Sequence, residues 1–461
     1  MYREEDLKAI LDNIDKITDK AKDKKLETLD PKRKEIHEIY KIIKEFIKKK
    51  NRIIYGGYAQ NALIKKKKLD DMFYKEVDMP DIEFYSPEPI KDLFELCDIL
   101  YKKNYPHVEG REGVHNETYK IFVNFKDGGY CDITYMPKNI YDNMRTSEIE
   151  GMRMIHPYFI YTDAYRVYTD PITSYYRLQK AFNRFEMLMK HYPIESSEKY
   201  NNLKYTFDMD KKLNEEILRF MRKKIFQNNN SLIVIGHYAY NQLLKIAGHD
   251  KYLINNPFYQ CISINYKEDI KKIFDILKQE YGDKITFKEY THFFQFTDKK
   301  INFYYDKQLI LQVYGNNERC ITYRYSEKKL TNFGTFQLIV LYFLINYNHA
   351  IVKRDKFDEN MYLKLLSHVF YTRNKYLSKT KKTVLDKTVF EEFTINCIGV
   401  PSDQLRESRL EGLRRRQKKL PSLFIYKPSN RDTKPPDYKF RNSSGNEIFN
   451  EKNFTIQKWY N

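Results

Sequence analysis

The chain is poor in cysteine and has no long apolar run. Its 461 residues include five cysteines without a C-x-x-C pair, and none of its ten histidines forms an H-x-x-x-H pair. We therefore expect neither a zinc site nor a disulfide framework, and an odd number of unpatterned cysteines fits a reducing compartment. The longest apolar run, from Phe336 to Ile345, is shorter than the ~20 residues that a membrane-spanning helix requires. We expect a soluble protein that is not secreted.

Acidic residues are in the minority. Lysine and arginine number 82 against 63 aspartate and glutamate residues, which gives a formal net charge of +19. Such an excess favours a polyanionic partner, because lysine and arginine displace counterions from phosphates. Lysine, asparagine, isoleucine and tyrosine are abundant throughout, so part of the excess can be compositional. The length predicts about three domains.

A short apolar stretch ends in a pair of glycines. Residues 52–55 are typical of a strand, Gly56 and Gly57 follow, and an amphipathic helix is predicted from Tyr58 to Ile64. Glycines let the backbone approach an anion closely, and the helix N-terminus behind them offers free N–H groups and a positive dipole end. A Gly-Gly pair alone is more often a plain strand-to-helix turn. The acidic residues that follow favour a phosphate-binding turn.

Three acidic residues occupy predicted strands downstream. Asp81 and Glu83 are two residues apart, so on a strand they point to one side. Asp132 lies mid-strand among apolar and β-branched residues, where an unpaired acid is costly. Hard oxygen ligands of this kind suit Mg²⁺ carrying a substrate phosphate. We expect Asp81, Glu83 and Asp132 to hold two Mg²⁺ (or Mn²⁺) ions for in-line attack on a nucleotide phosphate; a solvated strand face is the alternative.

The order of these residues resembles a known superfamily. Gly-Gly, then Asp-x-Glu on the next strand and a single later Asp is the pattern of the DNA polymerase β-like nucleotidyltransferases. Residues 163–180, DAYRVYTDPITSYYRLQK, are similar more narrowly to the poly(A) polymerase catalytic subunits of poxviruses and giant DNA viruses. The resemblance covers residues 52–190 well, although the spacing from Gly57 to Asp81 is longer than the superfamily usually shows. It implies template-independent transfer of AMP from ATP to the 3′-hydroxyl of mRNA.

The resemblance also implies how the substrates are held. Gly56 and Gly57 would bind the phosphates of ATP through backbone N–H groups, and Asp132 would help the RNA 3′-hydroxyl lose its proton. On the helix predicted from residue 171, Arg177 and Lys180 lie near one face. On one interpretation they neutralise the charge of the leaving pyrophosphate. On the other they belong to a solvated stripe.

A second stretch repeats the glycine turn. Residues 231–244, SLIVIGHYAYNQLL, echo residues 51–64, NRIIYGGYAQNALI, so that Gly236 falls on Gly56 and His237 replaces the second glycine. At the same offset the three acids are replaced, since Cys261, Ser263 and Gln312 fall on Asp81, Glu83 and Asp132. Such a repeat indicates a duplicated fold whose second copy could not hold two metal ions.

The expected fold class is α+β. It comprises tandem duplicated nucleotidyltransferase domains, each a mixed sheet flanked by helices and the second catalytically degenerate, with helical N-terminal and basic C-terminal extensions. The predicted boundaries are a helical N-terminal segment at 1–50, a catalytic domain at 51–200, a degenerate domain at 201–345, and a C-terminal helical region with a basic tail at 346–461.

Three stretches that flank the predicted site carry further expectations. The N-terminal segment shows apolar positions at helical spacing, from Leu7 to Ile17 and from Ile36 to Ile47, and is expected to pack as a cap on the catalytic domain. Lys65–Lys68 could border the nucleic-acid path, and Arg406–Lys419 is a candidate RNA contact. For both charge runs a solvated surface is the alternative.

Partners and location follow from the resemblance. The expected partners are the 3′ end of single-stranded RNA and ATP, and no membrane is expected. The expected location is the host cytoplasm, at the viral factory, or the virion if the protein is packaged. Poxvirus relatives use a separate processivity subunit; for this chain a homodimer is our hypothesis, because the second copy has lost catalysis yet kept its fold. Two rival functions stay open. One is a nucleotidyltransferase with another nucleotide or acceptor, such as a terminal uridylyltransferase, and the other is a non-catalytic RNA-binding scaffold.

Overall fold

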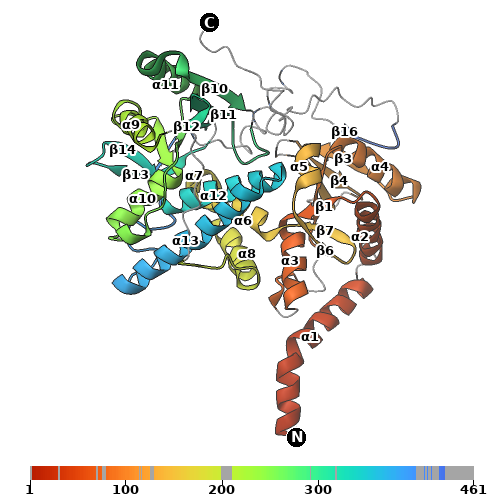
Figure 1. The fold of residues 1–461 in the computed structure, drawn as a ribbon. Coiled ribbons are helices and arrows are strands. Elements are labelled where there is room, and N and C mark those ends of the chain that lie inside the picture. The colour runs from red at the N-terminus through yellow and green to blue at the C-terminus, as the bar shows by residue number, and fades with distance from the viewer. Residues whose placement is uncertain are drawn as a thin grey trace. The chain divides into compact units, whose positions relative to one another are not determined.

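The computed structural model divides into two compact units, each described by itself (Figure 1). Unit 1 consists of Met1–Tyr135, Thr146–Ile155 and Glu407–Tyr438, and unit 2 consists of Met136–Arg145, His156–Arg406 and Lys439–Asn461. The structure describes residues 3–29, 32–68, 71–74, 79–113, 115, 117–124, 129–198, 210–290, 292–316, 319–400, 410, 413, 417 and 425–430. Apart from residues 410, 413 and 417, the predicted RNA contact Arg406–Lys419 lies outside the described residues.

Unit 1 is built on one mixed sheet of eight strands. The strands are β1 (Ile53–Tyr55), β2 (Ile82–Ser86), β3 (Glu109–Glu112), β4 (Thr118–Phe122), β5 (Cys131–Tyr135), β6 (Thr146–Ile149), β7 (Met152–Ile155) and β16 (Ile425–Tyr426). Their order is β16-β3-β4-β5-β2-β1-β7-β6. Strand β2 is parallel to β5 and β1 is parallel to β7, whereas the other neighbours are antiparallel. The parallel pairing places the start of β2 beside the start of β5.

The described helices of unit 1 are α1 (Glu4–Leu29), α2 (Lys32–Lys49), α3 (Gly56–Lys67) and α4 (Pro89–Lys102). The apolar stripe of α2 is buried as predicted, with Ile43 and Ile47 fully covered. The stripe of α1 is not, since Leu11 is 71% and Ile17 52% exposed. The prediction that both helices pack as a cap is therefore wrong for α1, whose apolar face has no cover within the described part of unit 1.

Unit 2 contains a second mixed sheet of eight strands. They are β8 (Leu232–Ile235), β9 (Tyr259–Ser263), β10 (Ile285–Tyr290), β11 (Lys300–Tyr305), β12 (Gln308–Gly315), β13 (Ile321–Ser326), β14 (Thr331–Gly334) and β15 (Cys397–Ile398), in the order β10-β11-β12-β9-β8-β14-β13-β15. Seven strands repeat the order and directions of β3-β4-β5-β2-β1-β7-β6. The eighth strand is added at opposite edges, as β16 beside β3 and as β15 beside β13. The chain thus contains the same seven-strand topology twice.

The described helices of unit 2 are α5 (Lys138–Asn143), α6 (Pro157–Tyr168), α7 (Pro171–Ser174), α8 (Leu178–His191), α9 (Lys211–Met221), α10 (Gly236–Ile246), α11 (Tyr266–Tyr281), α12 (Phe336–Lys353) and α13 (Lys356–Thr380), with single turns η2 (Tyr175–Arg177), η3 (Arg222–Phe226), η4 (Asp250–Tyr252) and η5 (Gly282–Lys284). Helix α12 is buried on nearly every side and lies beside α13 (Figure 1). The longest apolar run is therefore a core helix. Among the described helices none is long and apolar enough to cross a membrane.

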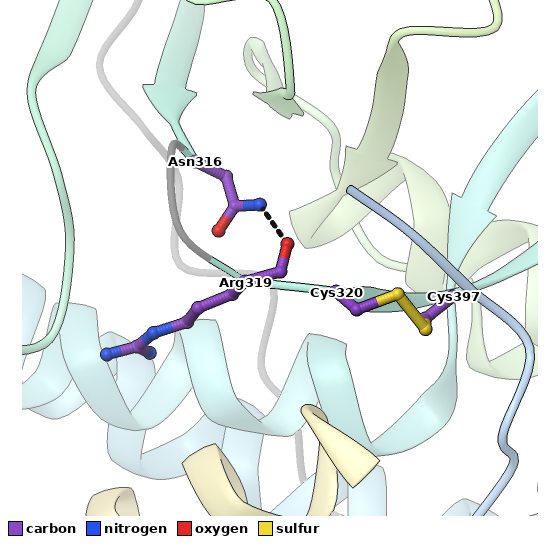
Figure 2. The surroundings of a disulfide bond; sticks show 4 residues. All are labelled: Asn316, Arg319, Cys320 and Cys397. Carbon is purple, nitrogen blue, oxygen red and sulfur yellow. Dashed lines mark hydrogen bonds between the residues drawn. A yellow bond between two sulfur atoms is a disulfide. The ribbon is translucent and has the colours of Figure 1, made fainter. Parts of the chain in front are cut away.

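Two cysteines of unit 2 form a disulfide bond (Figure 2). Cys320, just before β13, is bonded to Cys397 of β15, and their Cα atoms are 5.2 Å apart. The expectation of no disulfide is wrong, because a sequence separation of 77 residues conceals the pairing that two adjacent strands bring about. The remaining thiols, Cys97, Cys131 and Cys261, are free and buried, and burial raises their pKa values.

We predict that Cys397→Ser lowers the free energy of unfolding of unit 2 by about 2–4 kcal/mol, since a cross-link over a long loop restricts the unfolded chain. Thermal unfolding with and without reductant should show the same loss in the reduced wild type. Alkylation in denaturant followed by intact mass should label three cysteines without reductant and five with it. Five labels without reductant would contradict the disulfide.

Candidate active site

The turn from β1 to α3 directly contacts one of the predicted acids. Gly56 has a φ of +68°, in the left-handed region that favours glycine. A Cβ on Gly56 would overlap the carboxylate of Glu83, whose Oε2 lies against the turn. The N–H of Gly57 donates a hydrogen bond of 3.0 Å to that oxygen. Position 56 therefore requires glycine for its backbone conformation and for space, and the predicted order of strand, glycine turn and helix is confirmed.

Glu83 and Asp132 face each other on adjacent strands. In the parallel pairing of β2 with β5 their Cα atoms are direct partners. Paired residues project to the same face of a sheet, so the two carboxylates lie side by side. Asp81 immediately precedes β2, and its negative charge helps to raise the pKa of Asp132. The structure thus brings the three predicted acids together near the start of two strands.

Lys120 of β4 forms an ion pair with the Asp132 carboxylate. The two residues are partners in the antiparallel pairing of β4 with β5, and Nζ lies 2.6 Å and 2.7 Å from the two carboxylate oxygens. Burial raises the pKa of Asp132, the charge of Lys120 lowers it, and the net direction is upward. In the described part of the chain, no group of three or more acidic, histidine or cysteine side chains is arranged to hold a metal ion. A divalent ion at Asp132 would have to replace the ammonium group.

Hydroxyl groups and aromatic rings link neighbouring strands on the face of the sheet that carries Glu83 and Asp132. Tyr55 Oη and Thr134 Oγ1 are 2.7 Å apart, and Thr134 Oγ1 and Thr118 Oγ1 are 2.9 Å apart. The ring of Tyr55 stacks on Tyr85 with centroids 3.9 Å apart. These contacts join β1, β2, β4 and β5, the strands that contain or surround the acids.

The segment that leads into β2 is tied to two helices. Tyr40 Oη of α2 donates a 2.7 Å hydrogen bond to the carbonyl of Met79. The Oδ1 of Asn61 in α3 accepts hydrogen bonds of 2.9 Å from the backbone N–H groups of residues 73–74. Burial raises the pKa of Tyr40, and the nearby charge of Asp81 adds to the rise. The carbonyl held by Tyr40 lies two residues before Asp81.

The predicted pyrophosphate-binding residues belong to unit 2. Arg177 ends η2, exposed, with its guanidinium 5.4 Å from the ring centroid of Tyr176. Lys180 lies exposed in the first turn of α8, without an ion pair to any described residue. A short 3-10 turn divides the helix predicted from residue 171 into α7 and α8. The structure brings the acids and glycines together in unit 1 and describes these two cations in unit 2.

The second sheet keeps the turn but not the acids. Gly236 has a φ of +69°, and a Cβ there would overlap the amide of Gln260. Gln260 is the Cα partner of Gln312, and its Nε2 donates a 2.8 Å hydrogen bond to Gln312 Oε1. Two neutral amides, hydrogen-bonded to one another, therefore stand where unit 1 has Glu83 and Asp132.

This register corrects the sequence alignment of the two copies. The prediction that Ser263 falls on Glu83 is wrong, because Gln260 occupies that place. Ser263 matches Ser86 instead: Ser263 Oγ donates to Asp269 and Ser86 Oγ donates to Asp92, over 2.6 Å and 2.5 Å. The stretch between the glycine turn and the following strand is three residues shorter in the second copy, and a single offset cannot allow for that.

Two interactions of the site were missed from the sequence. One is the ion pair of Lys120 with Asp132. The sequence shows that Lys120 lies mid-strand, but its partner depends on the register of β4 with β5. The other is the buried ion pair of Arg52 with Asp92, with N–O distances of 2.7 Å and 2.8 Å, which joins the start of β1 to α4. Asp92 is fully buried, so the pair supports the sheet rather than a ligand.

Known proteins resemble both parts of the chain. Residues 41–174 match the family "Poly(A) polymerase catalytic subunit", and residues 194–458 match "APMV, Putative poly(A) polymerase, catalytic subunit, C-terminal". A "Putative poly(A) polymerase catalytic subunit" of Acanthamoeba polyphaga mimivirus is 32% identical over 97% of this chain and 83% of its own length. The protein of that name from African swine fever virus is 30% identical over 35% of this chain and 34% of its own. The Megavirus polyadenylate synthase crystal structure matches with a TM-score of 0.84 at 33% identity, covering 97% and 92% of the two chains.

We predict that Lys120→Met makes stability depend more steeply on pH. Without the ammonium the pKa of Asp132 rises further above its unfolded value, so the folded state loses stability as pH rises through that pKa. At pH 7.5 the loss should be about 2 kcal/mol, because a largely buried carboxylate is left without its hydrogen-bond donor, and at pH 4.5 it should be smaller. Denaturant unfolding at both pH values measures it, and Lys120→Arg should retain stability. A loss that is equal at both pH values would contradict the assignment.

Proposed function

The chain belongs to the viral poly(A) polymerase catalytic subunits of the giant DNA virus type, and we propose that it adds adenylates from ATP to the 3′ end of mRNA without a template. The observation that supports this most is the side-by-side pairing of Glu83 with Asp132 next to the turn at Gly56. In the reaction the 3′-oxygen of RNA forms a bond to the α-phosphorus of ATP, and the bond to pyrophosphate breaks.

We propose that the three acids hold two Mg²⁺ or Mn²⁺ ions. Carboxylate oxygens suit these ions, and the ammonium of Lys120 against both oxygens of Asp132 supports a cation at this place. Asp81, Glu83 and Asp132 are the residues that would hold these ions. Such ions, when bound, supply Lewis-acid polarisation of the phosphate and a lower pKa for the attacking hydroxyl.

The side chains also have roles of their own. We assign to Asp132 the role of helping the 3′-hydroxyl of RNA lose its proton, which passes to solvent. The Gly57 N–H, which donates to Glu83 here, would donate to a phosphate oxygen once Glu83 turns to its ligand. We assign phosphate binding to Gly56 and Gly57, and neutralisation of the leaving pyrophosphate to Arg177 and Lys180.

The second sheet is proposed to be a degenerate copy of the first. The shared seven-strand order and the repeated overlap at Gly236 support duplication. Gln260 and Gln312 are neutral and bonded to each other, so they offer no charge to divalent ions. We propose a functional division into the helical segment 1–50, the catalytic domain 51–200, the degenerate domain 201–345, and the C-terminal region 346–461, in which the catalytic domain extends past unit 1 into the unit 2 segment that begins at His156.

We propose that two copies associate through α1. Leu7, Ile10, Ile14 and Ile17 follow the spacing of a two-heptad seam, and Leu11 flanks it. Leu7, Leu11, Ile14 and Ile17 are between 43% and 71% exposed, and the same stripe on a second chain is self-complementary. A separate processivity subunit is the other candidate partner. The proposed location is the host cytoplasm, at the viral factory or in the virion.

The reaction is tested by extension of a labelled single-stranded RNA primer with Mg²⁺ and each nucleoside triphosphate in turn. Long ladders are expected with ATP alone. Asp81→Ala with Glu83→Ala should reduce extension at least ~10³-fold, which corresponds to about 4 kcal/mol of transition-state stabilisation. The matched control is Gln260→Ala with Gln312→Ala, which alters the same places in the second sheet and should leave extension intact.

Other outcomes of this assay distinguish the rival functions. Extension with a nucleotide other than ATP would keep the mechanism and overturn adenylate as the substrate. RNA binding without extension by the wild type, unchanged by the acid substitutions, would favour a non-catalytic scaffold.

Association is tested by light scattering after size exclusion at micromolar concentration. We expect twice the chain mass of 56.1 kDa, and we expect Leu11→Lys with Ile14→Lys to give the monomer, because charges cannot enter an apolar seam. Leu385→Lys with Ile395→Lys, at apolar residues elsewhere that are at least as exposed, should stay dimeric. A monomeric wild type would exclude the homodimer.

A further inference from the structure

A groove lies beside the proposed catalytic turn of unit 1. Its volume is about 440 Å³, and its walls are α2, the first turn of α3 and the segment that leads into β2. Tyr58 in one wall follows Gly57 directly, and Pro80 in another precedes Asp81. The groove therefore adjoins both segments that position the proposed reacting groups.

Three lysines of α2 line the groove. Lys41, Lys44 and Lys48 recur at spacings of three and four, so they lie on one face of the helix. Ile43 lies on the other face and is fully buried. No described acidic side chain forms an ion pair with any of the three. Lys44 Nζ lies 5.3 Å from the ring centroid of Tyr58. The amphipathic pattern of α2 thus places along the groove a row of cations that form no ion pair with a described residue.

We propose that this lysine groove, defined by Lys41, Lys44, Lys48 and Tyr58, binds the phosphodiester backbone of the RNA strand whose 3′ end is extended. The inference rests on the proposed function. From Lys41 to Lys48 the helix rises about 10 Å at ~1.5 Å per residue, a length that fits successive phosphates of an extended strand. A more compact anion would need its cations gathered at one point.

The residue types also suit a primer of any sequence. Lysine contacts phosphate as a point charge and does not read bases. A tyrosine ring such as Tyr58 can stack with every base. An enzyme that works without a template has to hold RNA in this way, because its substrate has no fixed sequence.

Binding of a labelled single-stranded oligoadenylate, measured by anisotropy without ATP or Mg²⁺ over a range of salt, tests the proposal. Lys41→Gln, Lys44→Gln and Lys48→Gln together should weaken binding at least ~10-fold at low salt. The slope of log K against log salt should fall by about 2, since each lost phosphate contact removes ~0.7 for a single strand. The matched control removes the same charge from exposed lysines of α11 (Lys267→Gln, Lys271→Gln and Lys272→Gln) and should change neither quantity by more than about a third of those amounts.

A second variant changes binding in the opposite direction. Glu45 is the acidic residue in the wall of the groove, so Glu45→Gln should tighten oligoadenylate binding about two- to threefold, which a misfolded protein cannot do. The KM for ATP at saturating primer should stay within twofold of the wild type in all variants. Equal RNA binding in the groove and control variants would overturn the proposal. A raised KM for ATP with unchanged RNA binding would also overturn it, because the groove would then bind the triphosphate.

The binding assay stands apart from catalysis. If the wild type does not extend RNA yet loses binding with the lysine substitutions, the groove is an RNA site and the proposed reaction alone is refuted. If the wild type extends RNA and the lysine substitutions do not alter binding, the reaction holds and the groove is refuted.

Discussion

The close approach of Gly56 to Glu83 is the constraint on which the rest of unit 1 depends. The chain can leave β1 and begin α3 at once only because position 56 adopts a positive φ and has no Cβ. The same absence of a side chain lets the acidic strand pass directly against the turn. Gly236 repeats both features against Gln260 in the second sheet. The approach is therefore a requirement of this sheet and helix arrangement, whichever side chain faces the turn.

The comparison of the two sheets separates what the fold requires from what the chemistry requires. Where the turn is kept but Glu83 and Asp132 are replaced by Gln260 and Gln312, the amides bond to each other and the sheet remains intact. Acids at these places are thus not needed for strand pairing. In unit 1 they are costly, because burial raises the pKa of Asp132 and Lys120 is needed to offset it. A costly feature that the fold does not require is best explained by function.

The sequence could predict what depends on local pattern. The glycine turn, the acids at strand positions and the repeat of the turn are all visible as residue types at short spacings. What depends on register could not be predicted: the pairing of Lys120 with Asp132 requires the β4–β5 alignment, and the bond between Cys320 and Cys397 requires β13 beside β15. Burial was equally hidden, since α1 and α2 show similar apolar spacing and only α2 is covered.

The charges near the Gly56 turn are of both signs: carboxylates lie beside the turn, and lysines of α2 lie next to it. Asp81, Glu83 and Asp132 lie near the turn where, in the proposed reaction, two further anions would have to meet, an RNA 3′ end and a triphosphate. Lys120 neutralises part of this charge, but its ammonium group is held by Asp132 and so offers little to an incoming strand. The lysines of α2 have no acidic partner among the described residues and lie next to the same turn. Their charge is free to attract phosphates at a distance and to offset repulsion by the acids, which a paired lysine cannot do. If the lysine groove binds RNA as proposed, the position of these lysines, more than the total of +19, relates the basic composition to function.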